Sequence, residues 1–346
     1  MAIGWLAEVQ SATIQYQQWF QLDIIYLAFC CYPDQKYFNQ HLFRAGHYKI
    51  PAHRQALPLA AIEAQMKLVF LFLFFPLAIF AQHEERKVFL YNTVFGGITS
   101  AVGAIINKPS TKKLTSTFIK GFWQGTLGGM INYSSKRSVY FISKYQNVAY
   151  AVPAKLLNAA GNSIIENAAL CEPFLQNWNI DYGPIRLDFS VNGKRKITAR
   201  LLPESVYALV EGWKKTELDV TTTLLSGSFA FAYKKGYSYP SRGTNYLGLS
   251  FGRAFVYTGS QTDPVVYNTI AHEMVHQFQY REYQVFNSWI KRFEKKVKGT
   301  RVNKLFSSYV YLDIPYFFIA YGLEGSYPYQ YRNKNFFEFE ADRCAQ

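Results

Sequence analysis

The sequence contains few of the residues that build thiolate metal sites. It has only four cysteines in 346 residues, namely Cys30, Cys31, Cys171 and Cys344. Their spacing matches no zinc-ribbon pattern, so metal binding through cysteine is not expected. Histidine is also scarce, with six residues in the whole chain. A close pair of histidines is therefore an unusual feature in this sequence.

Long hydrophobic runs are absent too. The apolar stretches Leu68–Phe80 and Val94–Ile106 each contain 13 residues, and the second includes Thr99 and Ser100. A helix needs about 20 apolar residues to cross a bilayer. The sequence therefore shows no array of spanning helices. Around Val94–Ile106 it favours a tightly packed soluble helical region over membrane insertion.

Residues 66–81 have the pattern of a secretory signal peptide. Lys67 supplies a basic start, Leu68–Phe80 an apolar region, and Ala81 a small residue near a cleavage point. Because a signal peptide stands at the beginning of its chain, we interpret residues 1–65 as a non-native upstream extension. The alternative is a genuine N-terminal region followed by a short internal hydrophobic helix.

A cleaved signal peptide would leave a mature chain that begins near Gln82. Such a protein would be exported to the periplasm, the cell envelope or the extracellular space. An oxidising compartment would permit a disulfide between Cys171 and Cys344, and two buried thiols are as compatible with the sequence.

Basic residues outnumber acidic ones. The chain has 37 Lys and Arg against 23 Asp and Glu, which gives a formal net charge of +14. We expect no nucleic-acid partner, because scattered lysines usually form a solvated surface. The basic run Lys291–Lys304 could make peripheral contact with lipid head groups, although a solvated helix end is the commoner explanation.

Small residues recur at helical spacing in the region 82–180. Gly121, Gly125 and Gly129, for example, form the pattern G-x-x-x-G-x-x-x-G. Such stripes let helices pack backbone against backbone, in membranes or in soluble bundles. No pattern that carries chemistry occurs here, so we predict a helical Gly/Ala-rich region.

From Asp181 the sequence pattern becomes that of β-structure. Ile185–Val191 alternates apolar with polar residues, Asn192–Gly193 predicts a type I′ turn, and Lys196–Leu202 provides a partner strand. The pattern further predicts a helix over Val206–Lys214, a strand over Thr221–Tyr233, a loop over Gly236–Thr244 and a strand over Leu247–Tyr257. The predicted fold class is α+β, with residues 181–346 as a separate mixed-sheet domain.

The most specific motif is His272-Glu273-Met274-Val275-His276, which spells H-E-x-x-H. On a helix, His276 lies only about 40° around the axis from His272, so both imidazoles can hold one metal ion. Glu273 can reach a water on that metal without being a ligand. Asp263-Pro264 predicts the start of the helix. A chance string on an amphipathic helix is the competing interpretation.

A second acidic motif, Glu338-Phe339-Glu340-Ala341-Asp342, lies near the end of the chain. Glu338 and Asp342 share one helix face, and Ala341 allows a neighbouring helix to approach closely. Catalytic zinc sites use three protein ligands. Glu338 can be the third, with Asp342 as an acceptor that orients a ligand histidine. A solvated acidic helix is the alternative.

H-E-x-x-H followed downstream by E-x-x-A-D resembles the glutamate-zincin metallopeptidases. The downstream half is most similar to the group that contains the CAAX prenyl proteases and the bacterial heat-shock membrane protease. The resemblance covers only roughly the last hundred residues, and it implies that Glu338, rather than Glu340, is the ligand. It also implies a zincin-like domain in which the strand before the active-site helix is a sheet edge that pairs with extended substrate. An ordinary strand packed under a helix fits Leu247–Tyr257 equally well.

These expectations define an exported zinc-dependent metallopeptidase that acts on a peptide or protein. His272, His276 and Glu338 would bind Zn²⁺, and Glu273 would be the general base. The alternative is a catalytically silent zinc-binding envelope protein that serves as a binding or structural module. Retention of Glu273 favours the enzyme, since a purely structural site needs no general base. The sequence defines neither the substrate nor the oligomeric state.

Overall fold

The structure is a computed structural model. It describes the backbone of residues 84–191, 197–213, 216–233, 239–241, 244–246, 248–259, 263–297, 308–314, 316–325 and 335–346. The upstream extension predicted at 1–65 and the signal peptide predicted at 66–81 lie outside the described residues, and both stay predictions.

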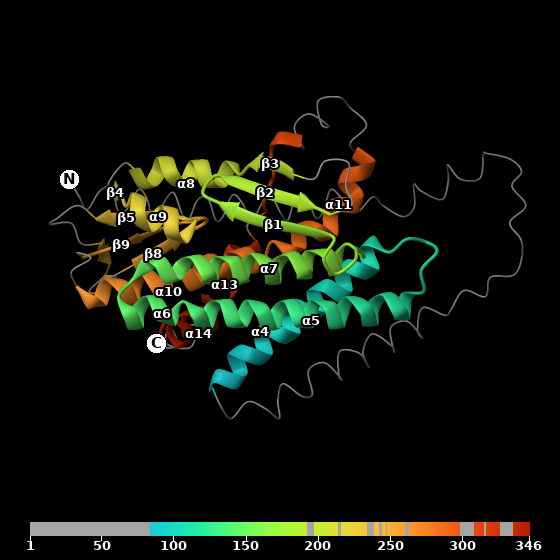
Figure 1. Ribbon diagram of the computed structural model, residues 1–346, viewed down its shortest axis with the longest axis horizontal. Coiled ribbons are helices and arrows are strands. Elements are labelled where there is room, and N and C mark those ends of the chain that lie inside the picture. Colours follow the sequence, from blue (N-terminus) through green and yellow to red (C-terminus); the bar gives the residue numbers. More distant parts are fainter. Residues whose placement is uncertain are drawn as a thin grey trace, which may run out of the picture. The chain divides into compact units, whose positions relative to one another are not determined.

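Three long helices form the first part of the fold. They are α4 (Glu84–Asn107), α5 (Leu114–Ser138) and α7 (Ala151–Ala169), with the short α6 (Tyr140–Tyr145) and the 3-10 turn η1 (Val148–Tyr150) between the last two. α5 packs on α4 along one side and on α7 along the other (Figure 1). The contact is backbone to backbone, because a Cβ on Gly125 or Gly129 would overlap the α4 backbone. The predicted helical packing through small residues is found over residues 84–169, but the predicted end of the region at residue 180 is wrong, because a strand already begins at Asn177.

An antiparallel sheet follows, built from β1 (Asn177–Tyr182), β2 (Ile185–Ser190) and β3 (Ile197–Leu201) in the order β1-β2-β3. Ile185 pairs with Leu201 and Phe189 with Ile197, which confirms the predicted pairing of these two strands. The Asn192–Gly193 turn lies outside the described residues. β1 packs against α7, so the sheet lies directly beside the helical part (Figure 1).

The predicted strand over Thr221–Tyr233 is wrong in its first half. The structure has α8 (Pro203–Trp213), β4 (Thr216–Leu218), the helix α9 (Val220–Ser226) and then β5 (Phe229–Tyr233). Asp219 caps α9 by accepting a hydrogen bond from the Thr222 amide, and Gly227 ends it in the left-handed conformation. These caps outweigh the β preference of the threonines, because each satisfies backbone groups at a helix end.

The single strand predicted over Leu247–Tyr257 is a hairpin. β8 (Gly248–Phe251) and β9 (Ala254–Tyr257) pair antiparallel through a turn at Gly252, whose φ of 59° favours glycine. The second sheet has the order β4-β5-β9-β8, with β5 and β9 parallel. The loop predicted over Gly236–Thr244 is wrong in part, because it overlaps another hairpin, β6 (Tyr239–Ser241) with β7 (Thr244–Tyr246).

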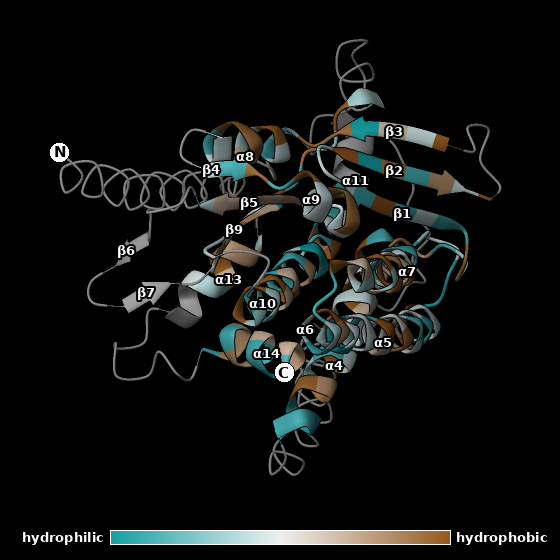
Figure 2. Cartoon of the chain, turned by 60° about the vertical axis from the view of Figure 1, so that its left-hand side comes forward, coloured by the Kyte–Doolittle hydropathy of each residue, from teal (hydrophilic) through white to brown (hydrophobic). Residues whose placement is uncertain are grey.

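In the described residues after 263 there are four helices, α10 (Pro264–Glu282), α11 (Val285–Val297), α13 (Tyr316–Gly325) and α14 (Phe336–Ala345). α10 lies between the second sheet and α14, and it also contacts α5, α6 and α13 (Figure 2). The fold class is mixed α+β, as predicted.

One hydrophobic core spans the two regions that the sequence divides at residues 180 and 181. It joins Val88 and Ile142 of the helical part to Phe255, Ile270 and Ala341 of the C-terminal part. All described residues belong to one compact unit. The helical part therefore forms a wall of the C-terminal region rather than a module apart from it.

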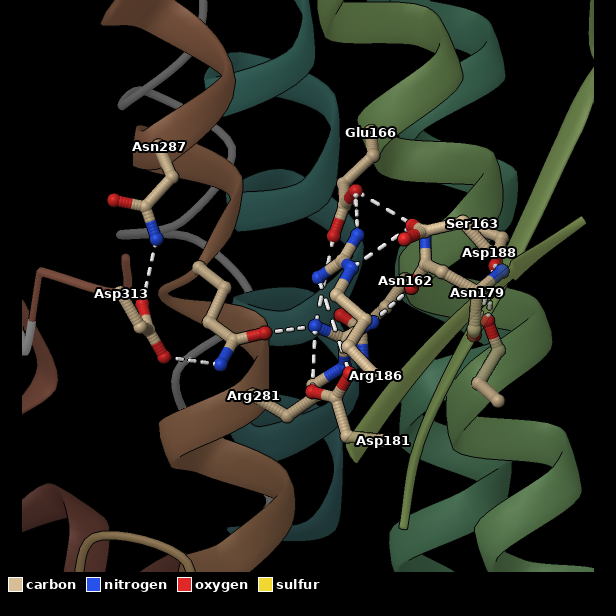
Figure 3. A network of polar contacts seen from close by, with 12 residues as sticks. Asn162, Ser163, Glu166, Asn179, Asp181, Arg186, Asp188, Arg281, Asn287 and Asp313 are labelled. Carbon is tan, nitrogen blue, oxygen red and sulfur yellow. Dashed lines mark hydrogen bonds and ion pairs between the residues drawn. The ribbon is translucent and has the colours of Figure 1, made fainter. Parts of the chain in front are cut away.

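A buried polar network ties the first sheet to α7 and α10 (Figure 3). Arg186 on β2 donates to Glu166 on α7 at 2.6 Å, and Arg281 on α10 is 2.9 Å from Asp181 on β1. Arg253, in the turn between β8 and β9, pairs with Asp181 and lies 3.1 Å from Asp313. The inner face of the sheet is therefore held by ion pairs rather than by apolar packing.

Both cysteines in the described part of the chain are free thiols. Cys344 is buried on α14, and Cys171 donates to the Ala104 carbonyl at 3.0 Å. Of the two possibilities left open by the sequence, the structure has the pair of thiols.

Candidate metal centre

The helix α10 begins where the sequence predicts it. Asp263 accepts a hydrogen bond from the Val265 amide at 3.0 Å, and Pro264 occupies the first turn, where its missing N–H costs nothing. Ile270, Met274 and Phe278 are fully buried on the core side. Their packing fixes the rotation of the helix and directs His272 and His276 toward α14.

The helix α14 brings Glu338 to the two histidines. Asn335 caps this helix by accepting from the Phe337 amide at 2.9 Å. Ala341 has no exposed surface, which fits the predicted role of a small residue that lets the two helices approach closely. Glu338 then faces His272 and His276 across the interface between α10 and α14.

Three potential ligand atoms converge on one point. His272 Nε2 lies 3.1 Å from His276 Nε2 and 3.2 Å from Glu338 Oε2. His276 Nε2 is 3.5 Å from the same carboxylate oxygen. Ligands at about 2.1 Å from a tetrahedral zinc ion lie about 3.4 Å from one another. His272, His276 and Glu338 can therefore hold a metal ion, and their spacing suits a small tetrahedral one.

Each histidine is oriented through its second ring nitrogen. His272 Nδ1 is 2.9 Å from Asp342 Oδ1, which is the role expected for Asp342. His276 Nδ1 is 2.8 Å from Gln279 Oε1, and Gln279 in turn donates to the Phe337 carbonyl at 2.9 Å. Because both Nδ1 atoms are occupied, both Nε2 atoms are free to face the metal position.

The carboxylates around the histidines favour a bound positive charge. Burial alone would lower the pKa of His272, but hydrogen bonds to Asp342 and Glu338 raise it to about 10. Burial alone would raise the pKa of Glu338, but hydrogen bonds from His272 and His276 hold it well below its usual range. A divalent cation at this point would replace protons that the cluster otherwise attracts.

Glu273 lies beside the cluster but outside the ligand set. Only 5% of its surface is exposed, and its Oε2 atom has no hydrogen-bond partner. Burial raises its pKa above the usual value for glutamate. A Cβ on Gly248 of β8 would overlap the Glu273 carboxylate, so glycine leaves the space that this side chain occupies. A buried carboxylate with a free oxygen is the arrangement that a general base requires.

The other glutamate of the second motif points elsewhere. Glu340 is fully buried and pairs with Lys136 of α5 at 2.9 Å. Lys136 also pairs with Glu282 of α10 at 2.7 Å, and Gln279 donates to Glu340 at 2.8 Å. Glu340 therefore connects α14 to α5 and α10, and the structure brings Glu338, not Glu340, to the histidines.

Tyr321 is the tyrosine that reaches the cluster. Its hydroxyl donates to Glu338 Oε1 at 2.5 Å, and its ring stands edge-on to His276. The sequence offers seven tyrosines in this region without ranking them: Tyr309, Tyr311, Tyr316, Tyr321, Tyr327, Tyr329 and Tyr331. The last three lie outside the described residues. Tyr309 is exposed and Tyr311 is stacked between Arg186 and Arg200.

Gln279 orients His276, and Lys136 holds Glu340 outside the ligand set, although neither residue belongs to a sequence motif. Gln279 stands three residues after His276, so helical spacing offers a signal for it. Lys136 lies on α5, far away in the sequence, and nothing local indicates that it would meet Glu340.

The basic run Lys291–Lys304 is described only in part. Lys291 faces inward and lines a cavity of about 250 Å³ with Arg186, Arg200, Glu166 and Asp188. Residues 298–304 lie outside the described part, so peripheral lipid contact through this run stays a prediction.

No protein family, no characterised protein and no solved structure matches this chain. The function must therefore be argued from the geometry of the site itself.

Proposed function

We propose that this protein is a zinc-dependent metallopeptidase. The observation that carries the proposal is the convergence of His272, His276 and Glu338, with the buried carboxylate of Glu273 beside them. A binding site for a metal alone would need only the three ligands. The unpartnered Glu273 oxygen adds a group that can exchange a proton with a water molecule.

The donor set supports zinc. Two imidazole nitrogens and one carboxylate oxygen form a common ligand set of catalytic zinc sites, which keep a fourth position for water or substrate. Calcium and magnesium prefer sites built from oxygen atoms alone. His272, His276 and Glu338 would hold the ion, while Asp342, Gln279 and Tyr321 orient these ligands through the hydrogen bonds described above.

The chain's own residues would carry the proton transfer. When bound, zinc polarises a carbonyl group and makes an adjacent water more acidic. Glu273 accepts the proton of the attacking water through its free Oε2 and passes it to the leaving amine. Its raised pKa supports this second step, because a weaker acid holds the proton until the leaving group takes it.

An extended peptide is the substrate class that the neighbouring sheet supports. β8 stands at the edge of the second sheet, and no other strand in the described part of the chain pairs with its outer side. An edge strand offers unpaired backbone groups to an extended peptide. The strand directly before α10 is β9, which is internal, so the edge is β8 and not the strand that the resemblance implies. The small residues Gly248 and Ser250 pack under α10.

The test combines metal analysis with one conservative substitution. Purified full-length protein should contain about one zinc per chain by mass spectrometry, and His272→Ala should lose it. Glu273→Gln should keep the zinc and the melting temperature but lose roughly 10²–10⁴-fold in the rate of peptide hydrolysis. A broad peptide library at neutral pH is the appropriate substrate.

Glu217→Gln is the matched control, because this glutamate is exposed on β4 and lies outside the cluster. It should cleave peptides like the wild type. If the protein binds zinc but cuts no peptide, and Glu273→Gln behaves like the wild type, the protein is a catalytically silent zinc-binding module and not a peptidase. A protein without zinc would contradict both.

A further inference from the structure

The helix α5 has its polarity reversed relative to a helix of a soluble protein. Its buried face consists of small and polar residues: Thr117, Gly121, Gln124, Gly125, Gly128, Gly129, Asn132, Ser135 and Lys136. Its exposed face carries Ile119, Trp123, Leu127 and Met130, and 67% of the Trp123 surface is accessible. These four residues recur at helical spacing and form one apolar stripe opposite the glycine face.

The neighbouring helices repeat the pattern. Inside the bundle, Asn132 donates to Asn162 at 3.0 Å, and Ser100 donates to the Ile165 carbonyl at 3.1 Å. Outside, α7 exposes Leu156, at 57% of its surface. Leu90, Val94 and Ile98 of α4 are only half-buried, while the same helix buries glycine, serine and asparagine.

In water the opposite distribution is favourable, because apolar side chains leave the solvent and polar ones stay in it. Helices in lipid pack through small residues and polar side chains, and they expose large apolar residues to the surrounding hydrocarbon. The bundle therefore has the composition expected of helices whose outer face meets lipid.

The distribution of charged residues on α4 and α5 also suits contact with lipid. α4 has no charged residue between Lys87 and Lys108, and α5 has none between Lys120 and Lys136, which is buried and paired. Lys112 and Lys113 are exposed in the connection between the two helices, and Lys112 Nζ also donates to the Cys171 carbonyl at 3.4 Å. Basic residues beside an apolar face are typical of contact with anionic lipid head groups.

The dimensions indicate docking rather than spanning. From Ile119 to Met130 the stripe extends about 16 Å, roughly half the thickness of the hydrocarbon core. α4 is long and apolar enough to cross a membrane, but its other side packs on α7 and α11. One face of the bundle is thus available to lipid, and the opposite face belongs to the core.

We infer that the outer face of α5, with Ile119, Trp123, Leu127 and Met130 at its centre, docks onto an anionic lipid bilayer. The apolar stripe enters the boundary between head groups and acyl chains, and Lys112 and Lys113 contact the head groups. This surface is distinct from the metal centre, which lies between α10 and α14 on the other side of Lys136.

The test measures flotation of the full-length protein with lipid vesicles. The wild type should float with vesicles of phosphatidylcholine and phosphatidylglycerol, and less with phosphatidylcholine alone. Replacing Ile119, Trp123, Leu127 and Met130 together by glutamine should reduce binding by at least about tenfold, because the apolar area that enters the bilayer is lost. The melting temperature should not fall, since these side chains are exposed in the fold.

The control is a matched set on α8, where Val206, Tyr207, Val210 and Trp213 are also exposed and include one tryptophan. Their replacement by glutamine should leave vesicle binding unchanged. Lys112→Gln with Lys113→Gln should weaken binding only to the anionic vesicles, and added salt should do the same to the wild type. Equal binding by the α5 variant and the wild type would overturn the inference. Failure of the wild type to float with vesicles would also overturn the inference. In that case, loss of self-association in the α5 variant would show that a second copy of the chain covers this face.

Discussion

Glu338 and Glu340 stand two residues apart on α14 and have opposite surroundings. Glu338 faces the imidazoles of His272 and His276, whereas Glu340 is closed into the interior with Lys136. A helix turns by about 200° over two residues, so neighbouring acidic groups reach different sides. The same sequence motif thus supplies one carboxylate to the candidate metal centre and one to the buried ion pair with Lys136.

This difference predicts separate effects for two conservative substitutions. Glu338→Gln should weaken zinc affinity by well over tenfold with little loss of thermal stability, because it removes a ligand from a partly exposed position. Glu340→Gln should lower the melting temperature, because Lys136 then loses one of its two buried counter-charges, but it should keep the zinc. Metal titration against a chelator and thermal melting separate the two. Loss of zinc in Glu340→Gln alone would reverse the assignment.

Tyr321 offers a second prediction at this scale. Its hydroxyl orients Glu338, so Tyr321→Phe should weaken zinc affinity by about 10–100-fold, the range typical of groups that hold a metal ligand in place. Tyr316→Phe is the control, because Tyr316 lies on the same helix but packs on Phe286. Chelator competition is the measurement. Equal affinities for the two variants would show that the Tyr321 hydroxyl does not support the ligand.

The sequence predicts most of the candidate metal centre because the candidate ligands lie at fixed helical spacings. His272, His276, Glu338 and Asp342 all follow from two short motifs. Tyr321 does not, since its position depends on how α13 packs against α14. Residues that act through tertiary contact leave no local pattern.

At the scale of elements, α4 and α5 depend on contact between their backbones. A Cβ on Gly125 would overlap the Gly96 carbonyl and Ser100, so no side chain fits without moving the helices apart. If α4 and α5 moved apart, the position of α5 would change, and the ion pairs of Lys136 with α10 and α14 would weaken.

Gly125→Ala should therefore destabilise the protein by about 1–3 kcal/mol, although alanine favours helix formation by itself. Gly322→Ala on α13 is the control, since a Cβ there meets nothing within 4 Å. This change should be neutral or stabilise by up to about 1 kcal/mol. Urea unfolding gives both values. A neutral Gly125→Ala variant would mean that the two helices do not pack as closely as described.

Two of the elements that the sequence mispredicts share one cause. α9 contains consecutive threonines, which favour strands, yet Asp219 and Gly227 cap it as a helix. The turn at Gly252 divides a continuous β pattern into two strands because glycine permits its positive φ. In both cases a residue at the end of an element decides the structure. The average helix or strand propensity of the segment does not include the effect of such a residue.

At the scale of the whole molecule, the helical and C-terminal parts fold around one core and are joined by buried charges. Lys136 contacts Glu282 and Glu340 in one place, and Glu166 contacts Arg186 and Arg281 in another. The sequence predicts a boundary at residue 181, because the β pattern begins there. It does not show that these charges pair across the boundary, since each partner lies on a different element.

The network around Asp181 makes the stability of the molecule depend on acid. Asp181 is only 2% exposed. Burial alone would raise its pKa, but Arg253, Arg281 and Arg186 hold the pKa well below the usual range. Figure 3 shows Asp181 beside Arg186 and Arg281. A carboxyl whose pKa is depressed by folding stabilises the native state above its unfolded pKa of about 3.9. This contribution is lost as the pH falls through the lower, native value.

Asp181→Asn tests this directly. At pH 7 the variant leaves buried arginines without their shared counter-charge, so it should be less stable than wild type by on the order of 3–5 kcal/mol. Below about pH 4 the difference should shrink, because the unfolded wild-type chain then takes up a proton at this carboxyl while the native carboxyl stays ionised to lower pH. Urea unfolding at a series of pH values measures the gap. Asp188→Asn is the control, since Asp188 also pairs with arginine but is 22% exposed, and its effect should be smaller. A gap for Asp181→Asn that stays constant from pH 7 to about pH 3 would show that its ionisation does not stabilise the fold.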